Sequence, residues 1–318
     1  MTDGFINLNK PAGWTSHDCV ARVRRLLNTK KVGHGGTLDP LATGVLPIAV
    51  GRATRLLQFL PEQKAYRAVI RFGLTTTTDD LEGEVLAQQP AAQLQRSAIE
   101  AILPKFIGTL SQRPPMYSAI QVEGRRLYDL ARQGKTMEVP SRQVAIHRLT
   151  VWQWQAGSQP ELTLDIDCGP GTYIRSLARD LGAAAGTGAT LAYLLRTHSS
   201  GFDLGKSTTL EALEQAITSG SFLPVPAGNA VRHLEAIALS STLSQRWRMG
   251  QKLTMADISG LSEAVLSKPA GSAVRVVTHD TGEFLGIGEI RMVSPSIMAL
   301  PAPTDSKVLA PKMVFLAI

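Results

Sequence analysis

Asp39 is the residue in this chain whose surroundings best suit it to chemistry. It lies in the stretch Gly33-His34-Gly35-Gly36-Thr37-Leu38-Asp39-Pro40-Leu41-Ala42-Thr43-Gly44, where four glycines let the backbone turn freely and leave space for a ligand. The following proline restricts Asp39 to extended conformations, so the carboxylate is held at a fixed place in its loop. A carboxylate held in this way could serve as a nucleophile. Because an aspartate before a proline also forms simple turns, these residues alone leave both interpretations open.

Other segments that could carry chemistry are weaker. Gly186-Thr187-Gly188 resembles part of a dinucleotide-binding fingerprint, but Leu191 stands where a third glycine belongs, and we interpret the segment as a helix end followed by a turn. The sequence has no Gly-Lys-Ser/Thr phosphate loop, no Cys-x-x-Cys pair and no cluster among its six histidines. We therefore expect neither a metal nor a cofactor.

The composition indicates a folded intracellular protein with a polyanionic partner. The 318 residues include 33 Lys and Arg against 26 Asp and Glu, which gives a net charge of +7 and a sequence pI near 9.6; this balance favours partners such as nucleic acid. The two cysteines, Cys19 and Cys168, are far apart in sequence and fit a reducing compartment. Because the sequence lacks a secretion signal and a run of about 18 apolar residues, we expect a cytoplasmic protein without a membrane span.

The elements that must position Asp39 can be located from apolar spacing. We expect strands at 5–9 and 45–50, a helix at 52–60 and a strand at 66–72. A helix should begin after Thr15 or Ser16, with Val20, Val23, Leu26 and Leu27 on its apolar face. In the strand at 66–72, Tyr66, Ala68, Ile70 and Phe72 share one face.

The rest of the chain predicts a mixed fold and a second unit. We expect a helix ending near Pro104, a helix that includes Arg125 and Arg126, strands at 141–155 and 161–168, and a helix at 172–185. Strands interleaved irregularly with helices favour a mixed α/β sheet. Short strand-like runs that alternate with turns after about residue 245 indicate a small β-rich unit.

The Asp39 segment, extended through Gly51-Arg52-Ala53-Thr54-Arg55-Leu56, resembles the signature of the TruB-type tRNA pseudouridine synthases. Every specified position of the pattern G-H-x-G-x-L-D-P-x-A-T-G is matched without a gap. The resemblance implies that Asp39 is the catalytic nucleophile.

Three further blocks are similar to the same family. The run Gly171-Thr172-Tyr173-Ile174-Arg175 is similar to a block whose tyrosine and arginine line the active site, and Lys64-Ala65-Tyr66 to one whose tyrosine contacts the target base. Tyr193-Leu194-Leu195-Arg196 resembles a segment whose leucine packs near that base. Taken singly, these residues are equally typical of core packing or of a surface charge.

The resemblance implies a role for each matched residue. Arg175 would pair with Asp39 and keep it ionised, and Tyr66 would stack on the uracil and assist proton transfer. His34, five residues before Asp39, would fill the space left by an extruded base or hold the strand. The other expected substrate-binding residues, some for the base and some for phosphates, are Tyr173, Leu194, Arg52, Arg55, Arg125, Arg126 and Arg196.

These observations predict a mixed α+β pseudouridine synthase fold with a largely antiparallel sheet over residues 1–235, an RNA-clamping insertion at 114–142, and a PUA-like β-rich unit at 240–318. The resemblance implies an isomerase that acts on the uridine at position 55 in the T-arm of tRNA, works as a monomer and needs no obligate protein partner. Two alternatives stay open: a synthase of the type that acts inside guide-RNA particles on rRNA, and an RNA-binding or tRNA-folding protein that needs no catalysis.

Overall fold

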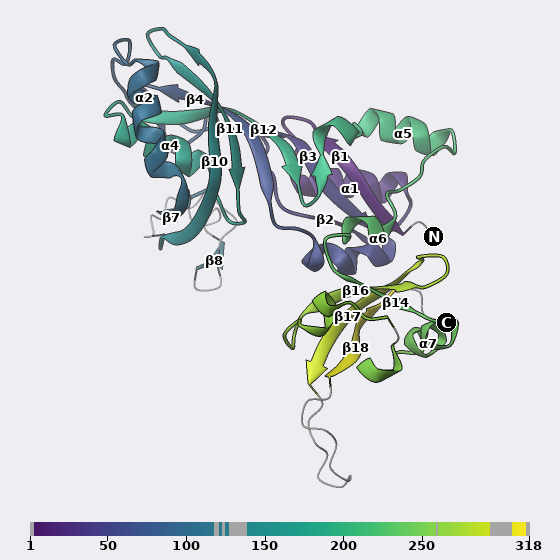
Figure 1. The fold of residues 1–318 in the computed structure, drawn as a ribbon. Coiled ribbons are helices and arrows are strands. Elements are labelled where there is room, and N and C mark those ends of the chain that lie inside the picture. Colours follow the sequence, from purple (N-terminus) through teal and green to yellow (C-terminus); the bar gives the residue numbers. More distant parts are fainter. Residues whose placement is uncertain are drawn as a thin grey trace.

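The computed structural model describes residues 3–117, 121–122, 125–126, 139–258, 260–292 and 307–315. A large sheet with helices on its faces forms the greater part of the molecule, and a smaller sheet near the C-terminus packs beside it (Figure 1). Within the described ranges, no helix is long and apolar enough to cross a lipid bilayer.

The large sheet is mixed and mainly antiparallel, as predicted. Its strand order is β1-β3-β12-β4-β11-β10-β7, and β2 and β13 pair with β3 and β12 at its margins. Of its pairings, β3 with β12 is parallel and the others are antiparallel. The strands are β1 (Gly4–Lys10), β2 (Val32–His34), β3 (Thr43–Val50), β4 (Lys64–Phe72), β7 (Gly108–Gln112), β10 (Arg142–Gln155), β11 (Glu161–Cys168), β12 (Ala189–Ser199) and β13 (Phe202–Asp203).

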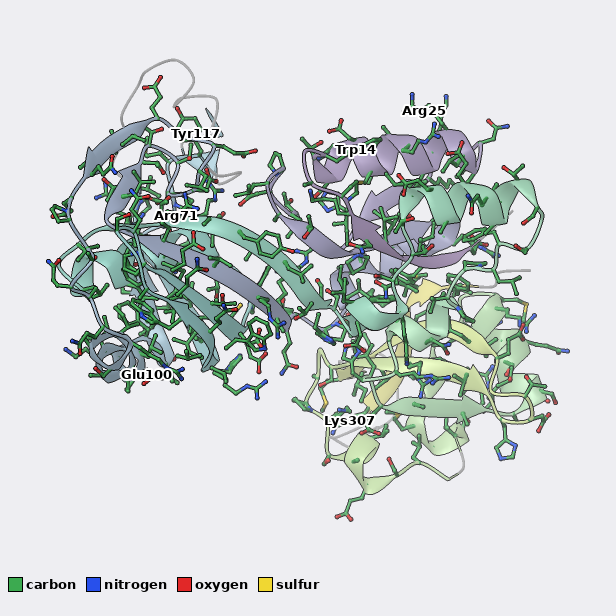
Figure 2. The ribbon with its side chains drawn as sticks, turned by 90° about the horizontal axis from the view of Figure 1, so that it is seen from above. Trp14, Arg25, Arg71, Glu100, Tyr117 and Lys307 are labelled. Atoms are coloured by element: carbon green, nitrogen blue, oxygen red, sulfur yellow. The ribbon has the colours of Figure 1, made fainter. Side chains whose placement is uncertain are left out.

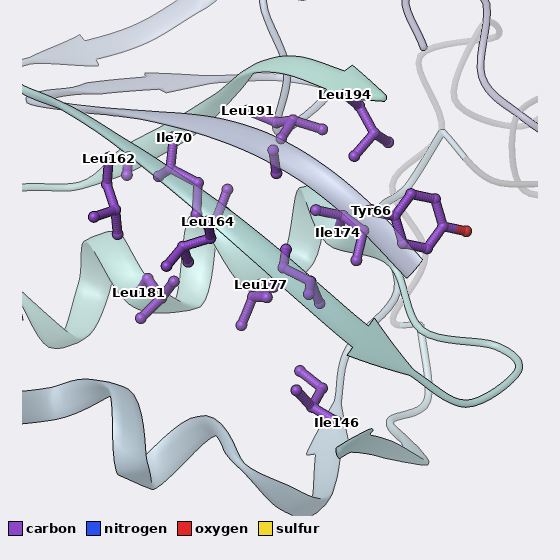
Figure 3. Packing of buried hydrophobic residues seen from close by; sticks show 14 of the residues in the cluster. Tyr66, Ile70, Ile146, Leu162, Leu164, Ile174, Leu177, Leu181, Leu191 and Leu194 are labelled. Atoms are coloured by element: carbon purple, nitrogen blue, oxygen red, sulfur yellow. The ribbon is translucent and has the colours of Figure 1, made fainter. Parts of the chain in front are cut away.

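The main core lies under the central strands. The alternating face of β4 that was predicted, Tyr66 to Phe72 in steps of two, is buried against α2 (Arg96–Ile102) and α4 (Ile174–Ala184). Ile174, Leu177 and Leu181 on α4 join this core, also as predicted. Figure 3 shows Tyr66 at the end of the cluster, with its hydroxyl pointing away from the apolar side chains. Tyr66 therefore lies near the start of the central strand β4, at the end of the apolar core.

A second layer covers β1 and β3. Here α1 (Ser16–Leu26) begins at the Thr15 cap, where Thr15 and Asp18 bond reciprocally. The apolar side chains of α1 pack with those of α5 (Leu210–Thr218) over the sheet. The helix predicted after β3 forms as a 3₁₀ helix, η1 (Gly51–Phe59). Gly51 starts it with a φ of 63°, a backbone angle that glycine adopts without strain.

The C-terminal unit is β-rich, as expected. Its sheet has the order β14-β16-β17-β18-β15, with Trp247 of α7 (Ser241–Arg248) fully buried beside it. Apolar residues of this unit and of the large sheet share one cluster, which includes Phe5, Leu56, Ile287 and Met313. The strands are β14 (Ala236–Leu239), β15 (Leu253–Thr254), β16 (Ala273–Thr278), β17 (Phe284–Met292) and β18 (Lys307–Val314).

One predicted helix is wrong. Arg125 and Arg126 form the short strand β9 (Arg125–Arg126), which pairs antiparallel with β8 (Gln121–Val122). The remainder of that predicted helix lies outside the described residues. The remaining elements are β5 (Leu74–Thr76), β6 (Val85–Gln88), η2 (Leu103–Phe106), η3 (Leu204–Lys206), α6 (Ala227–Ala230), η4 (Met255–Asp257) and α8 (Glu263–Leu266).

Candidate active site

The loop between β2 and β3 holds Asp39 between two buried anchors. Leu38 and Ala42 lie in the main core, and the hydroxyl of Ser16 accepts a hydrogen bond from the Leu38 N–H at 2.8 Å. Gly44 closes the loop with a φ of 101°, and a Cβ at this position would lie 2.3 Å from the carbonyl oxygen of Arg196. Packing and close backbone approach therefore fix the loop, while the Asp39 side chain stays 36% exposed.

Two fully buried cations bind the carbonyl groups of this loop. Lys10 at the end of β1 donates to the carbonyls of Pro11, Trp14 and Pro40 at 2.9, 2.7 and 3.2 Å. Burial lowers the pKa of Lys10 to about 8. Sequence reasoning missed this residue; the available signal was a lysine that ends an apolar strand directly before a proline turn.

Arg196 of β12 is the second buried cation, and its position corrects a prediction. We expected it to bind substrate, but its side chain is fully buried. Its guanidinium donates to the carbonyls of Val45, Thr37 and Gly36 at 2.7, 3.1 and 3.1 Å. Because loop carbonyls surround this group, Arg196 acts on the Asp39 loop from beneath and does not reach an RNA surface.

Arg175, in the first turn of α4, lies beside Asp39. Its Nε is 2.9 Å from Asp39 Oδ2, although the N–H does not point along that line, so the contact is chiefly ionic. The two terminal nitrogens donate to the carbonyls of Thr78 and Tyr117 at 3.2 and 3.0 Å. With only 6% of the side chain exposed, the guanidinium has little access to water, and its charge is weakly screened at the Asp39 carboxylate.

Asp80 forms the far side of the same charge cluster and was also missed. Its Oδ2 is 3.6 Å from Arg175 Nε, and its Oδ1 accepts a hydrogen bond from the N–H of Glu82 at 3.0 Å. The side chain is almost completely buried. The signal available in the sequence was the polar run at 75–80, four threonines followed by two aspartates, directly after a strand. One buried arginine thus serves two carboxylates, of which only Asp39 faces an open space.

Tyr66 and Leu194 lie where the predicted base-binding surface should be. Tyr66 on β4 pairs in register with Arg196 on β12, and Leu194 is two residues before Arg196 on the same strand. Both side chains are buried in the main core, and Figure 3 shows them at the same end of the cluster. Burial raises the pKa of Tyr66, so its phenol stays protonated at neutral pH. It can donate a hydrogen bond to a ligand.

His34 and Tyr173, two further predicted site residues, lie on different elements. His34 ends β2, and its ring meets that of His17 edge-on at 5.3 Å between centroids. Burial, aided by His17 and Arg196, lowers the pKa of His34, so its imidazole is neutral at pH 7. Tyr173 precedes α4, and its main chain is held in both directions by the Gln112 side chain, at 2.8 and 3.1 Å.

The predicted phosphate-binding arginines do not form one group. Arg52 bonds the Asp3 carboxylate at 2.8 Å and the Phe315 carbonyl at 2.7 Å, and its guanidinium lies 5.2 Å from the centre of the Phe315 ring. Arg52 thus joins the two sheets, and its side chain is still 44% exposed, so its contact with phosphate stays a prediction. Arg55, one 3₁₀ turn further, is exposed. Arg125 and Arg126 lie on β9, away from this junction.

The cluster can supply one partly exposed carboxylate, a buried cation beside it, and a neutral phenol beside an apolar wall. Such a group suits nucleophilic attack on a small planar ligand and its confinement. Within the described ranges, no three His, Cys, Asp or Glu side chains come together as a metal site would require.

Three family models match the chain. "TruB family pseudouridylate synthase (N terminal domain)" matches residues 24–174, "tRNA pseudouridylate synthase B C-terminal domain" matches 175–223, and "Pseudouridine synthase II TruB, C-terminal" matches 236–297. The first of these spans Asp39 and Tyr66 and ends directly before Arg175.

Curated relatives match nearly the whole chain. Proteins called tRNA pseudouridine synthase B from Trichormus variabilis and Nostoc sp. are 52% and 53% identical to it, over 98% of both sequences in each case. One from Gloeobacter violaceus is 56% identical over 90% of this chain and 94% of its own.

Solved structures share the fold at lower identity. A Cbf5-Nop10-Gar1 complex contains a chain that is 26% identical, with a TM-score of 0.71 over 99% of this chain and 85% of that one. An H/ACA RNP bound to a substrate RNA containing 2'-deoxyuridine contains one that is 25% identical, with a TM-score of 0.69 over 98% and 85% of the two chains.

Proposed function

The chain belongs to the TruB family of pseudouridine synthases, and we propose that it converts the uridine at position 55 in the T-arm of tRNA to pseudouridine, with Asp39 as the nucleophile. It is an isomerase that forms pseudouridine in tRNA. Relatives that are 52% and 53% identical over almost their full length are named tRNA pseudouridine synthase B. The observation that supports the assignment of Asp39 is that its carboxylate is partly exposed and lies 2.9 Å from the buried Arg175.

The reaction rearranges bonds within one nucleotide. The bond between N1 of uracil and C1′ of ribose breaks, the freed base turns, and C5 forms a new bond to C1′. The proton leaves C5, and N1 finishes with a proton, so reactant and product have the same atoms and the same oxidation state. The protein must therefore supply a nucleophile, a route for one proton and confinement of the free base.

Each of these needs has a candidate in the cluster. Asp39 attacks the nucleotide, at C1′ or on the ring, with the Arg175 guanidinium beside its carboxylate. Tyr66 stacks on the uracil, and its neutral phenol assists the proton transfer. Leu194 and Tyr173 complete the wall that confines the base. Lys10 and Arg196 hold the Asp39 loop in place.

The same proposal covers RNA binding. A stacked uridine cannot reach a carboxylate, so the base must be extruded. The role proposed for His34 is to fill the vacated space or to hold the strand. Arg55, Arg125 and Arg126 supply phosphate contacts, the last two from an RNA-clamping insertion at 114–142. We further propose that residues 1–235 and 240–318 are the two domains, and that the protein works as a monomer.

A guide-RNA-dependent activity is the second candidate. It is favoured by the structural likeness to the chains of H/ACA and Cbf5 complexes, at 25–26% identity. The tRNA synthases share about twice that identity over the same length, which favours activity on tRNA without a guide.

The test is to incubate the purified chain with an unmodified tRNA transcript and to map pseudouridine along it. We expect modification at position 55 alone, with no guide RNA or other protein added. A transcript with cytidine at position 55 is the matched control. Modification elsewhere, or only after a guide RNA is added, would overturn the proposal.

The nucleophile is tested by Asp39→Asn. Asparagine keeps the size of the side chain and its ability to accept hydrogen bonds in the loop, but it cannot attack as a carboxylate. We expect pseudouridine formation to be abolished while the affinity for tRNA stays within a few-fold of the parent's. Turnover by the purified variant at more than a small fraction of the parent rate would show that another group is the nucleophile.

A further inference from the structure

Asp79, next to the buried Asp80, has an unusual backbone conformation. Its φ is 61°, in the left-handed region that residues with a side chain seldom adopt. Its carbonyl accepts a hydrogen bond from the N–H of Leu191 on β12 at 3.0 Å, which leaves the turn little freedom to relax. Such strain persists only where surrounding contacts hold it.

The contact that holds it comes from Arg179 on α4. The guanidinium of Arg179 donates to Asp79 Oδ2 at 2.9 Å and to the carbonyl of Arg113 at 2.8 Å. It also lies 3.0 Å from the carboxylate of Asp180, the next residue on the helix. Asp79 is mostly buried in this contact, with 16% of its side chain exposed.

Arg179 and Arg175 therefore contact consecutive residues of one turn, 78–80. They are four residues apart on α4, so they lie on the same face of the helix. Arg175 binds the carbonyl of Thr78 and lies beside the carboxylate of Asp80, while Arg179 binds Asp79 between them. Asp80 is also held by the Thr76 hydroxyl and the Glu82 N–H, and Asp79 is its direct neighbour in the same turn.

We propose that Arg179 is a positioning residue for pseudouridine formation: by pairing with Asp79 it holds the strained turn that sets Asp80 against Arg175, and thereby sets the charge that Arg175 presents to Asp39. This inference rests on the proposed function. It concerns a pair that lies outside the sequence blocks from which the site was predicted.

The pair Arg71–Glu161 provides a matched control. Its nitrogen and oxygen are 2.7 Å apart, and its side chains are 33% and 26% exposed, close to the 29% of Arg179. It joins β4 to β11 on the face of the sheet opposite the main core, and Figure 2 labels Arg71 there. A structural role alone would make Arg179→Gln and Arg71→Gln equivalent.

The experiment compares single-turnover rates in saturated complex with a T-arm hairpin. We expect Arg179→Gln to lower this rate on the order of 10- to 100-fold, the effect of a small displacement of catalytic groups, with Kd within about threefold of the parent's. Arg71→Gln should keep the parent rate. Adding Asp79→Gly to Arg179→Gln should restore most of the rate, because glycine adopts a φ of 61° without the ion pair.

Hydrogen exchange separates this inference from the proposed function. We expect faster exchange over residues 75–84 in Arg179→Gln than in Arg71→Gln, whatever RNA is modified. Equal exchange there, an equal rate in the two single variants, or a double variant as slow as Arg179→Gln would each overturn the positioning role. A parent protein that leaves tRNA unmodified would instead overturn the proposed function, and the exchange comparison would still decide whether Arg179 holds the turn.

Discussion

Arg175 and Arg71 each pair with a carboxylate, at 2.9 and 2.7 Å, yet they belong to two different electrostatic regions. Arg175 lies in the buried charge cluster with Asp39 and Asp80, with 6% of its side chain exposed and four protein partners. Arg71 lies on the open face of the sheet. The Arg67–Asp165 pair forms a similar contact on the same face, four residues earlier on β4. Distance alone therefore does not separate a catalytic pair from a surface pair.

Burial decides what each pair does. Water screens the surface pairs, so each contributes about 0–1 kcal/mol to stability. Removing one partner of a buried pair leaves an uncompensated charge, which costs about 3–5 kcal/mol. If Arg175 were removed, the unpaired charge would be that of Asp80, which is almost completely buried. The charge cluster therefore depends on Arg175 both for stability and for the positive charge beside Asp39.

Arg175→Ala should give the largest effect. We expect the single-turnover rate to fall on the order of 10²–10³-fold with near-normal RNA affinity, because the lost charge acts locally on Asp39. The midpoint of denaturant unfolding should also fall, because Asp80 loses its buried partner. Quench-flow kinetics and urea titration measure the two effects.

Arg175→Lys is the control for this prediction. Lysine keeps the positive charge but cannot reach two carbonyls and two carboxylates as the planar guanidinium does. We expect a rate between those of the parent and Arg175→Ala. A lysine variant as slow as the alanine variant would mean that the contacts of the planar guanidinium matter more for the rate than its positive charge.

The pH dependence of Lys10 should give the next largest effect. Burial lowers its pKa from 10.5 to about 8. As pH rises through about 8 in the folded protein, Lys10 loses its charge near Asp39 and one of its three N–H donors. We expect the rate to fall about tenfold, which corresponds to one charge-assisted hydrogen bond of about 1.5 kcal/mol.

Stability should change in the opposite direction over the same range. Between about pH 8 and 10.5 the unfolded chain still binds the Lys10 proton and the folded chain does not. The free energy of unfolding that this group contributes therefore rises with pH across that window. Lys10→Met should remove both trends, whereas Lys64→Met, a nearby half-buried lysine, should keep the fall in rate. A parent rate that stays level from pH 7 to 9.5 would contradict the prediction.

Arg125→Ala together with Arg126→Ala should affect binding rather than chemistry. Each phosphate contact contributes a slope of ~0.7–0.9 in log K against log salt, so the double variant should bind more weakly and with a flatter salt dependence. The rate in saturated complex should stay near the parent's. Filter binding at several salt concentrations checks this, and an unchanged slope would exclude both arginines from phosphate contact.

Arg71→Gln should give the smallest effect. Its pair with Glu161 is partly exposed, so we expect a loss of at most about 1 kcal/mol in the free energy of unfolding and an unchanged rate. A loss near that of Arg175→Ala would remove the distinction between the two regions.

Local patterns in the sequence predicted much of this molecule. The alternation of Tyr66, Ala68, Ile70 and Phe72 identified β4 and the face that it buries, because strand period and burial are properties of neighbouring residues. The Asp39 motif and the block around Arg175 identified the two members of the central ion pair. The roles of Tyr66, His34, Tyr173 and Leu194 stay predictions.

Apart from the short hairpin at Arg125 and Arg126, what the sequence did not show depends on contact between distant segments. Arg52 is a cation of the kind that binds phosphate, but it also donates to a carbonyl that lies 263 residues further along the chain. Arg196 was assigned to substrate binding because Tyr193–Arg196 resembles a family segment, and the sequence does not show that loop carbonyls 151–160 residues away bury it. Lys10 and Asp80 have local partners, but the contacts that tie them to the site, with the carbonyl of Pro40 and with Arg175, are made by residues far along the chain.

The cluster that Phe5 and Leu56 share with Ile287 and Met313 has a consequence for how the chain is made. The ribosome releases β1 and η1 long before it has assembled β18, and proteins fold from the N-terminus as they emerge. The apolar side of these early elements is covered in full only when the last strand arrives. Translation that stalls or ends before Lys307 would leave out Met313 and so part of that cover, and the product would be a target for chaperones even though Asp39 and its partners had all been synthesised.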